Sequence, residues 1–317
     1  MSKIYDVIVL GAGPAGLAAG LYSGRSRLST LIIEKAQDGG QIAITNEIEN
    51  YPGQVEGDSG PSLIARMTKQ AEHFGVERAS DLIKSVKLEG DIKTLVGAKG
   101  EYQARAVIIA TGAFPKPIGC KNEGEFVGKG ISFCATCDAS FFEGGDVYVV
   151  GGGDSAVEEA MYLTKFAKHV TIIHRRNELR AAKSIQEKAF KNEKLSFMWD
   201  TVVDEVKGGD AFGGEIMEHI IVKNVKTGEL TQIDLGDDDE DTLGLFGFIG
   251  YNPNSSLFEG MLDMENGYIK TDENMHTNIE GVYAAGDIRV KSLRQVVTAA
   301  ADGAIAAMQA EHYLSNK

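Results

Sequence analysis

The sequence has few cysteines and few prolines, and it lacks a long apolar run. Three cysteines among 317 residues are too few for the disulfide framework of a small secreted protein. No apolar stretch approaches the roughly 20 residues that span a bilayer. The first strand-like segment, residues 4–10, begins almost at once and leaves no space for a signal peptide. We therefore expect a cytoplasmic protein with no membrane partner.

Basic residues are also in deficit. The chain has 32 lysines and arginines against 46 acidic residues, which gives a net charge of −14. Nucleic-acid binding needs a basic face, so we expect no nucleic-acid partner. Glycine, in contrast, is abundant, with 38 residues against 6 prolines. This imbalance indicates tight turns and close backbone approaches to ligands rather than disorder.

Strand-like apolar runs alternate with helical patterns, which is typical of an α/β protein with parallel sheets. A strand at 4–10, a glycine turn at 11–16, a helix and a strand at 28–34 form the first unit. The same order returns about 140 residues later, with a strand at 146–150, a glycine turn at 151–156, a helix at 157–168 and a strand at 170–174. Two copies of one nucleotide-binding unit predict two Rossmann-like domains.

Two further strand-like segments, 107–113 and 245–250, mark where the chain crosses between the domains. We predict that the second domain is inserted into the first. The predicted boundaries are 1–115 and 245–317 for the split domain and 116–244 for the inserted one. The acidic run 237–241 just before the return crossing is interpreted as a solvated loop, with partner docking as the alternative.

The first glycine turn follows a strand and opens a helix, which is the context that a GxGxxG motif requires. Phosphates bind there because free N–H groups and the helix dipole favour anions. Glu34 ends the next strand and can accept hydrogen bonds from ribose hydroxyls. The motif residues are Gly11, Gly13, Pro14, Ala15 and Gly16. The alternative is a glycine turn that serves packing alone.

The second glycine turn has a different partner at the end of its next strand. Where the first unit has Glu34, the second has His174, followed by Arg175 and Arg176, with Arg180 one turn further on. Guanidinium groups bind a 2′-phosphate that a carboxylate would repel, so this unit favours NADPH over NADH. The motif residues are Gly151, Gly153, Asp154, Ser155 and Ala156. The alternative is a basic surface turn that pairs with Glu178 or Glu187.

A Cys-x-x-Cys-Asp segment precedes the second turn. Cys134 and Cys137 indicate a redox pair or half of a zinc site, but few other cysteine or histidine ligands are available for zinc. Asp138 is suited to exchanging a proton with a thiol, and a helix N-cap is its alternative role. Cys120 has no nearby partner and is interpreted as a structural thiol.

Over essentially its whole length the sequence resembles the low-molecular-weight bacterial thioredoxin reductases. The resemblance rests on GxGPAG at 11–16, GGQ at 39–41, ENYPG at 49–53, ATG at 110–112, CATCD at 134–138, GGGDSAVEEA at 151–160, HRRxxxRA at 174–181, FIGYxPN at 248–254, AAGD at 284–287 and RQV at 294–296. Ferredoxin-dependent relatives lack the second glycine turn and the HRR element, which favours NADPH as the electron donor.

The resemblance implies FAD on the split domain and NADPH on the inserted one. Beyond the first turn and Glu34, the implied FAD residues are Gly39, Gly40, Gln41, Asn50, Ala110, Thr111, Gly112, Gly286, Asp287, Arg294, Gln295 and Val296. Glu158 joins the NADPH residues. Asp287 would bind the ribitol region, and residues 294–296 would lie at the start of the last helix, near the flavin ring.

The resemblance also implies a mechanism and partners. Electrons would pass from NADPH through FAD to the Cys134–Cys137 disulfide and then to thioredoxin or a thioredoxin-like protein. The inserted domain would rotate between two positions about hinges at 112–117 and 242–247, and the protein would be a homodimer. Cys137 would engage the flavin and Cys134 the partner. The alternatives are a peroxiredoxin reductase, a small-molecule dithiol oxidase, or a non-catalytic NADPH or redox sensor.

Overall fold

The computed structural model describes residues 3–45, 48, 50–209, 215–236 and 242–317. It divides into two units: unit 1 comprises Met1–Phe114 and Asn252–Lys317, and unit 2 comprises Pro115–Tyr251. The first boundary lies within one residue of the predicted one. The second lies after residue 251 instead of 244, because strand β15 (Leu243–Phe248) is hydrogen-bonded inside the sheet of unit 2. The acidic run 237–241 lies outside the described residues.

Unit 1 is built on a mostly parallel sheet. Five parallel strands run in the order β3-β2-β1-β6-β19, and the antiparallel pair β5-β4 continues from the first half of β6. The bounds are Ile4–Leu10 (β1), Thr30–Glu34 (β2), Glu77–Ser80 (β3), Ile83–Lys87 (β4), Lys93–Gly97 (β5), Glu101–Ile109 (β6) and Val282–Ala284 (β19). This is the α/β fold that the glycine turn and its flanking strands predict.

The central strand of unit 1 is apolar on both faces. Val7 and Val9 pack into the cluster under the helices, whereas Ile8 and Leu10 pack into the cluster on the opposite face. Successive strand residues point to opposite sides, so a strand covered on both faces reads as a continuous apolar run. The predicted strand at 4–10 agrees with β1 for this reason.

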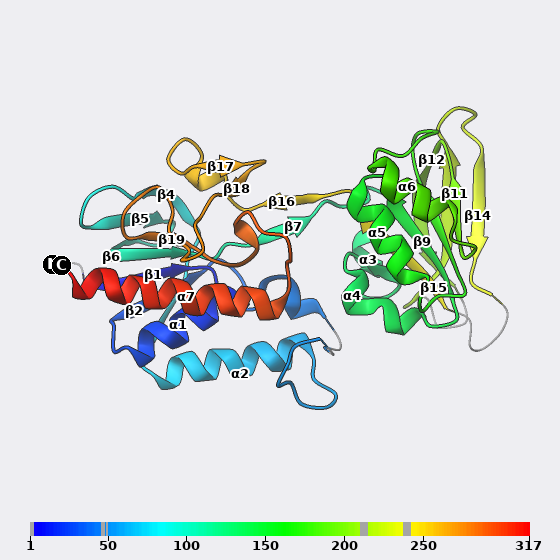
Figure 1. Cartoon of the computed structure of the whole chain (residues 1–317). Helices are drawn as coiled ribbons and strands as arrows, with labels where there is room; N and C mark the ends of the chain where they lie inside the picture. The colour runs from blue at the N-terminus through cyan, green and yellow to red at the C-terminus, as the bar shows by residue number, and fades with distance from the viewer. Residues whose placement is uncertain (1–2, 46–47, 49, 210–214, 237–241) are drawn as a thin grey trace. The chain divides into compact units, whose positions relative to one another are not determined.

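Three helices cover one face of the unit 1 sheet, as Figure 1 shows: α1 (Pro14–Arg25), α2 (Gly60–His73) and α7 (Val296–Ser315). Helix α7 lies very close to α1, since a Cβ on Gly303 would come within 2.1 Å of the Ala15 carbonyl oxygen. The C-terminal helix is therefore packed directly against the helix that follows the first glycine turn. Short elements complete the unit: η1 (Gly40–Ile44), η3 (Ser256–Phe258), β17 (Met264–Glu265), β18 (Tyr268–Ile269) and η4 (Gly286–Ile288).

Unit 2 repeats the parallel arrangement on a smaller scale. Its five-stranded sheet has the order β11-β10-β9-β15-β8, in which every pairing is parallel. The bounds are Ile131–Ser132 (β8), Asp146–Gly151 (β9), His169–Ile173 (β10) and Leu195–Met198 (β11). The helical segments are α3 (Glu123–Phe126), α4 (Ala135–Asp138), η2 (Ala139–Phe142), α5 (Asp154–Leu163) and α6 (Lys183–Phe190).

Helix α5 is shorter and begins earlier than the predicted helix at 157–168. It ends at Leu163, after which the Thr164 hydroxyl donates to the Met161 carbonyl oxygen at 2.7 Å. The Lys168 amide donates instead to the Gly145 carbonyl oxygen at 2.9 Å, which turns the chain into β10. An antiparallel sheet of β12 (Thr201–Gly208), β13 (Met217–Asn224) and β14 (Leu230–Asp234) completes the unit.

Two short strands carry the chain between the units. β7 (Ala113–Pro115) and β16 (Tyr251–Pro253) pair with each other as a two-stranded sheet. The predicted first hinge, 112–117, contains β7, whereas the predicted second hinge, 242–247, falls within β15 except for its first residue. Among the described residues, no helix combines the length and apolar character that crossing a membrane requires.

Candidate active site

Each glycine of the first turn is required for a different structural reason. Gly11 has a φ of +110°, and a Cβ there would lie 2.4 Å from the Ala110 carbonyl oxygen. A Cβ on Gly16 would lie 1.9 Å from the Gly11 carbonyl oxygen. Gly13 differs, because a Cβ there would point into open space, with the nearest atom at 3.9 Å. That space, at the start of α1 where Pro14 is the first residue, is a cradle for a phosphate.

The carboxylate of Glu34 is tied to the first turn. Its Oε2 accepts from the Ala12 amide at 2.8 Å and its Oε1 accepts from the Ala36 amide at 3.1 Å. The Gly39 amide donates to the Ala12 carbonyl oxygen at 2.8 Å, which joins the GGQ segment to the same turn. Glu34 keeps further acceptor capacity, since an ionised carboxylate offers about four lone-pair positions. The predicted ribose contact is compatible with this geometry.

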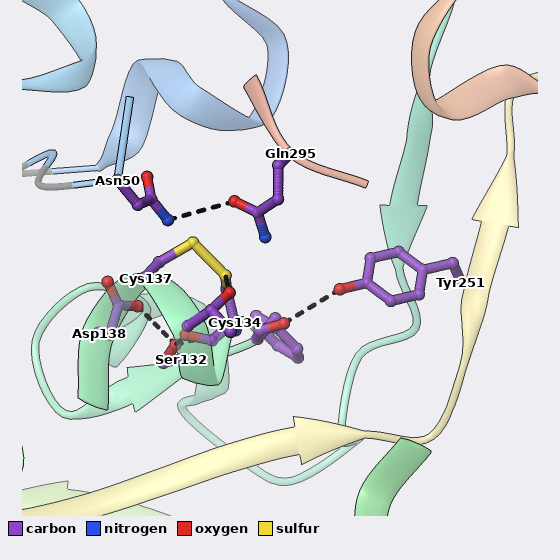
Figure 2. Close-up of a disulfide and its surroundings, with 9 residues drawn as sticks. Asn50, Ser132, Cys134, Cys137, Asp138, Tyr251 and Gln295 are labelled. Atoms are coloured by element: carbon purple, nitrogen blue, oxygen red, sulfur yellow. Dashed lines mark hydrogen bonds between the residues drawn. A yellow bond between two sulfur atoms is a disulfide. The ribbon is translucent and has the colours of Figure 1, made fainter. Parts of the chain in front are cut away.

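The remaining FAD residues of the first half follow the carboxyl ends of the strands. Gln41 donates a hydrogen bond to the Ala113 carbonyl oxygen. Thr111 and Asn254 exchange two hydrogen bonds between side chain and backbone, at 2.9 and 2.7 Å. Asn50 donates to Oε1 of Gln295 at 3.2 Å, as Figure 2 shows. Unit 1 thus brings together segments that are far apart in the sequence, at the edge where parallel sheets bind ligands. Gly40 and Gly112 lie in this region with φ values of +59° and +68°.

Asp287 has a buried carboxylate oxygen that is suited to a ligand hydroxyl. Its Oδ1 atom is buried and accepts no hydrogen bond from any residue that the structure describes. Burial raises the pKa of this carboxyl, while the charges of Lys291 and Arg294 oppose the rise. A buried acceptor without a partner is costly, and a ligand hydroxyl would satisfy it. The ribitol hydroxyls of FAD fit this requirement.

The start of α7 is also ordered. Gln295 is the N-cap, and Val296 is the first helical residue. The Gln295 amide donates to the Thr298 hydroxyl at 3.2 Å, so the helix start is capped by its own side chains. The Arg294 guanidinium lies over the ring of Tyr268 at 4.3 Å. The predicted position of residues 294–296 at a helix N-terminus agrees with this geometry.

The second turn also contains a cradle. A Cβ on Gly153 would meet no atom within 4 Å, whereas a Cβ on Gly151 would lie 2.4 Å from that of Ala156. Gly153 therefore leaves open space at the start of α5, as Gly13 does at the start of α1. At both turns, the middle glycine of the motif therefore leaves the start of the following helix open to a phosphate.

His174 is buried and packs against the second turn. It is 5% exposed, and a Cβ on Gly152 would come within 2.3 Å of its ring. Burial lowers the pKa of His174, and the charges of Arg180 and Arg176 lower it further, which favours the neutral ring. The ring also makes an edge contact with Trp199, with centroids 6.4 Å apart. His174 is thus a supporting residue beneath the turn, not a side chain open to solvent.

The three arginines around His174 are exposed. Arg175, Arg176 and Arg180 form no ion pair within the described part of the chain, so the predicted alternative of pairing with Glu178 or Glu187 is not what the structure shows. The Arg180 amide donates to the Gly152 carbonyl oxygen at 2.7 Å. This bond holds Arg180 beside the turn, so the phosphate cradle and the basic cluster form one site. The α5 residues Asp154, Ser155 and Glu158 lie exposed next to it.

The two cysteines form a disulfide, as Figure 2 shows. Their Cα atoms are 5.3 Å apart. Cys134 is the N-cap of the four-residue helix α4, and Cys137 lies within this helix. The Cys137 amide donates to the Cys134 carbonyl oxygen at 3.3 Å. No group of three or more histidine, cysteine or acidic residues that could hold a metal ion occurs among the described residues.

Asp138 lies beside the disulfide and is largely buried. Burial raises the pKa of its carboxyl, and a hydrogen bond from the Ser132 hydroxyl, at 2.5 Å, opposes the rise. Ser132 in turn accepts from the Cys134 amide at 3.1 Å. Asp138 occupies the N-cap position of η2, but its carboxylate makes no capping hydrogen bond there, and the N-cap of α4 is Cys134. Asp138 is therefore available for proton transfer rather than for capping.

Sequence reasoning missed Ser132, which orients both Asp138 and Cys134. Its only signal was a serine two residues before a Cys-x-x-Cys motif, which is too common to interpret alone. Cys120, in contrast, agrees with the prediction of a structural thiol. Burial raises its pKa to about 11, so it stays protonated and unreactive near neutral pH.

The family of the chain follows from its similarity to known proteins. The model of the pyridine nucleotide-disulphide oxidoreductases matches residues 5–303, and the chain belongs to this family. Its relatives are more specific. Thioredoxin reductase of Peptoclostridium litorale is 61% identical over 99% of this chain and 98% of its own length, and that of Bacillus subtilis is 48% identical over 98% and 95%.

Solved structures agree with these sequence relatives. Thioredoxin reductase from Streptococcus pyogenes is 43% identical, is matched over 100% of both chains and has a TM-score of 0.92. The chain is thus an oxidoreductase with the two Rossmann-type domains of its family, as the paired glycine turns predict. FAD and NADPH are the dinucleotides that such reductases use, and the two cradles fit them.

Proposed function

We propose that this chain is a thioredoxin reductase, which uses NADPH to reduce the disulfide of thioredoxin. The observation that carries the proposal is the Cys134–Cys137 disulfide with a buried carboxyl beside it, in the unit that also holds the basic nucleotide site. The full-length relatives named thioredoxin reductase support the same conclusion. The net reaction converts NADPH, a proton and oxidised thioredoxin to NADP⁺ and a thioredoxin dithiol.

Unit 1 holds FAD in this proposal and unit 2 holds NADPH. Bound FAD supplies the relay of two electrons between NADPH and the disulfide, which no side chain of the protein can provide. Gly13 leaves room for its pyrophosphate, and the free oxygen of Asp287 accepts from its ribitol. Gly153 leaves room for the NADPH pyrophosphate, and Arg175 and Arg176 bind the 2′-phosphate.

The dithiol then reduces the partner by two exchange steps. The Cys134 thiolate attacks one sulfur of the thioredoxin disulfide, which forms a mixed disulfide and releases the other thioredoxin sulfur as a thiolate. The Cys137 thiolate next attacks the Cys134 sulfur, which restores the internal disulfide and releases reduced thioredoxin. The two sulfurs of the reductase return to their starting oxidation state, so they act as carriers of the two electrons.

Asp138 handles the protons of this exchange. Its raised pKa means that the carboxyl keeps a proton more readily than an exposed aspartate does. A thiolate that is formed on reduction can take this proton, and the carboxylate can recover one from a thiol before attack. The Ser132 hydroxyl holds the carboxyl in place for both transfers.

A movement of unit 2 accompanies the cycle in this proposal. Nicotinamide and the disulfide both require near contact with the flavin, and the resemblance to the family implies that they take turns. The chain passes between the units only through β7 and β16, which pair with each other. These two strands replace 112–117 and 242–247 as the proposed hinge. The proposal also places the protein in the cytoplasm as a homodimer.

The first test is an NADPH-dependent disulfide assay with and without thioredoxin. We expect NADPH oxidation to depend on added thioredoxin and not on oxygen. Cys137→Ser should abolish thioredoxin reduction while FAD stays bound and reducible by NADPH, which is followed by the loss of flavin absorbance. A Cys137→Ser protein that cannot accept electrons from NADPH would contradict the assignment, and Cys120→Ser is the matched control.

Asp138→Asn tests the proton-transfer role. We expect thioredoxin turnover to fall about 100-fold, the lower range for a lost general acid or base. Because the folded pKa is raised, the native state holds the carboxyl proton more tightly than the unfolded chain, so this group loses its contribution to stability as pH rises through the folded pKa. In urea unfolding, the free energy of unfolding of the parent should therefore fall more than that of the variant as pH rises from 3.8, the ordinary pKa of the carboxyl, through its raised folded pKa.

The exposed Asp146 supplies the control for this experiment. Asp146→Asn changes the same charge on the same unit without touching the disulfide region, so turnover should stay unchanged. Equal turnover in the Asp138→Asn protein and the parent would show that the buried carboxyl takes no part in proton transfer.

A further inference from the structure

A buried cluster of charges lies next to Asp287. Asp302, on helix α7, is 6% exposed and accepts from Lys291 at 2.7 Å. Arg289 donates to both of its carboxylate oxygens at 3.2 Å. The Lys291 and Arg289 side chains are only 8% and 13% exposed. One carboxylate thus binds two cations in a region that excludes water, where charges must be paired.

Asp302 also holds the backbone that carries Asp287. Its Oδ2 accepts from the Gly286 amide at 3.0 Å, and Gly286 opens the short helix η4 that contains Asp287. Gly286 has a φ of +78°, a backbone conformation that few other residues adopt. A Cβ there would lie 2.8 Å from that of Ala15, at the first glycine turn. Asp302 thereby links α7 to the turn that presents Asp287.

The two cations are potential competitors for Asp287. Asp287 has one carboxylate oxygen without a partner among the described residues, and the charge of Lys291 already acts on this carboxyl. Without the charge of Asp302, Lys291 and Arg289 would be buried cations without a paired anion, and such cations form ion pairs with any carboxylate they can reach. The free oxygen of Asp287 lies on the same chain segment, and pairing with a cation would occupy it.

We propose that Asp302 is a positioning residue for FAD binding. It holds the Gly286–Ile288 turn in place, and it pairs with Lys291 and Arg289 so that these cations do not bind Asp287. Asp287 then keeps one oxygen free for the ribitol hydroxyls. The inference rests on the proposed function only in so far as unit 1 binds FAD. It adds a residue of helix α7 that lies outside the two recognised motifs of this region, AAGD and RQV, yet bonds the backbone of the first of them. Its chemistry is the sequestration of cations rather than contact with the cofactor.

The experiment is titration of the apoprotein with FAD, followed by flavin fluorescence. Asp302→Asn keeps an acceptor for the Gly286 amide but removes the charge that holds the two cations. We expect the Kd for FAD to rise at least about tenfold, while the Kd for NADP⁺, which reports on unit 2, stays within about twofold. Glu311→Gln, on the same helix but outside the cluster, is the matched control and should leave both constants unchanged.

A double variant separates sequestration of the cations from simple loss of packing. Asp302→Asn combined with Lys291→Met removes one negative and one positive charge, so Arg289 and Arg294 are the cations that remain on this segment. If Lys291 is the competitor, the Kd for FAD should return to within about threefold of the parent value. A purely structural role predicts the opposite, because the second change removes further buried contacts.

Two results would overturn the proposal. One is an Asp302→Asn protein that binds FAD within about twofold of the parent, and the other is a double variant that binds FAD no better than the single one. If Asp302→Asn fails to fold, the double variant decides alone, with binding more than about tenfold weaker than the parent counting against the proposal. Failure of the parent to reduce thioredoxin, with normal FAD binding, would instead contradict the proposed function.

Discussion

The two glycine turns occupy equivalent places in their units, yet they use their residues differently. In unit 1 the position between the first two glycines is Ala12, whose amide donates to Glu34 at 2.8 Å. In unit 2 the same position is Gly152, where a Cβ would come within 2.3 Å of the His174 ring. In unit 2 the residue after the next strand therefore limits the side chain that the turn tolerates, whereas in unit 1 the corresponding residue bonds the backbone of the turn.

The first glycines also differ between the units. Gly11 has a positive φ, whereas Gly151 does not and is limited instead by its neighbours Ala156 and Phe248. The third motif position is Gly16 in unit 1 and Ala156 in unit 2 for the same reason, since only unit 2 has space for a methyl group. The same glycine-rich motif thus adopts a different local geometry in each unit. Each geometry predicts a different response to substitution.

The largest effect is expected from Gly16→Ala. The new Cβ would lie 1.9 Å from a backbone oxygen that cannot rotate away, so the turn must distort, at a cost on the order of 3 kcal/mol. FAD content per chain, from flavin absorbance, should fall sharply. The matched change in unit 2, Ala156→Gly, should cost only about 1 kcal/mol and leave FAD content unchanged. Equal losses of FAD in the two variants would mean that the turns are not different.

Arg175→Ala with Arg176→Ala should have the next largest effect. The KM for NADPH should rise about tenfold to a hundredfold, because two charge-assisted contacts to the 2′-phosphate are lost. The KM for NADH should change less than about twofold, since NADH lacks that phosphate. Lys168→Ala, at the opposite end of β10, is the matched control. An equal rise in KM for NADPH and NADH would show that the two arginines do not select for the 2′-phosphate.

A smaller effect is expected from Gly152→Ala. The His174 ring must shift to admit the methyl group, so the KM should rise about threefold to tenfold for NADPH and NADH alike. Adding His174→Ala removes the clash and should recover part of the loss, which a double-mutant cycle measures. Independent, additive effects of the two changes would show that the ring does not determine the residue at position 152.

Much of the fold was predictable because the turns are local. The strand at 4–10 and the turn at 11–16 depend on neighbouring residues and agree with β1 and the start of α1. The second domain boundary depended instead on which sheet the strand at 243–248 joins. An apolar strand fits the middle of either sheet equally well, so its sequence carries no information on that choice.

The candidate site shows the same division. The Cys-x-x-Cys-Asp motif and the HRR cluster each consist of neighbouring residues in the sequence, so their residue types were enough to predict a redox pair and a phosphate-binding cluster. Ser132 and Asp302 act through contacts with residues on other elements, and a lone serine or aspartate has no distinguishing pattern. Long-range hydrogen bonds of this kind become visible only when the strands and helices are in place.

Two nucleotide-binding turns, a cysteine pair and the opposite charges at the two ribose positions can be read from the residue order alone. These features rest on local conformation and residue chemistry, which neighbours along the chain decide. Three features appear only in the folded chain: His174 is buried beneath its turn, Asp302 holds two cations, and Asp287 keeps one oxygen without a partner among the described residues. Burial and charge pairing depend on what packs from distant parts of the chain, and no local pattern specifies them.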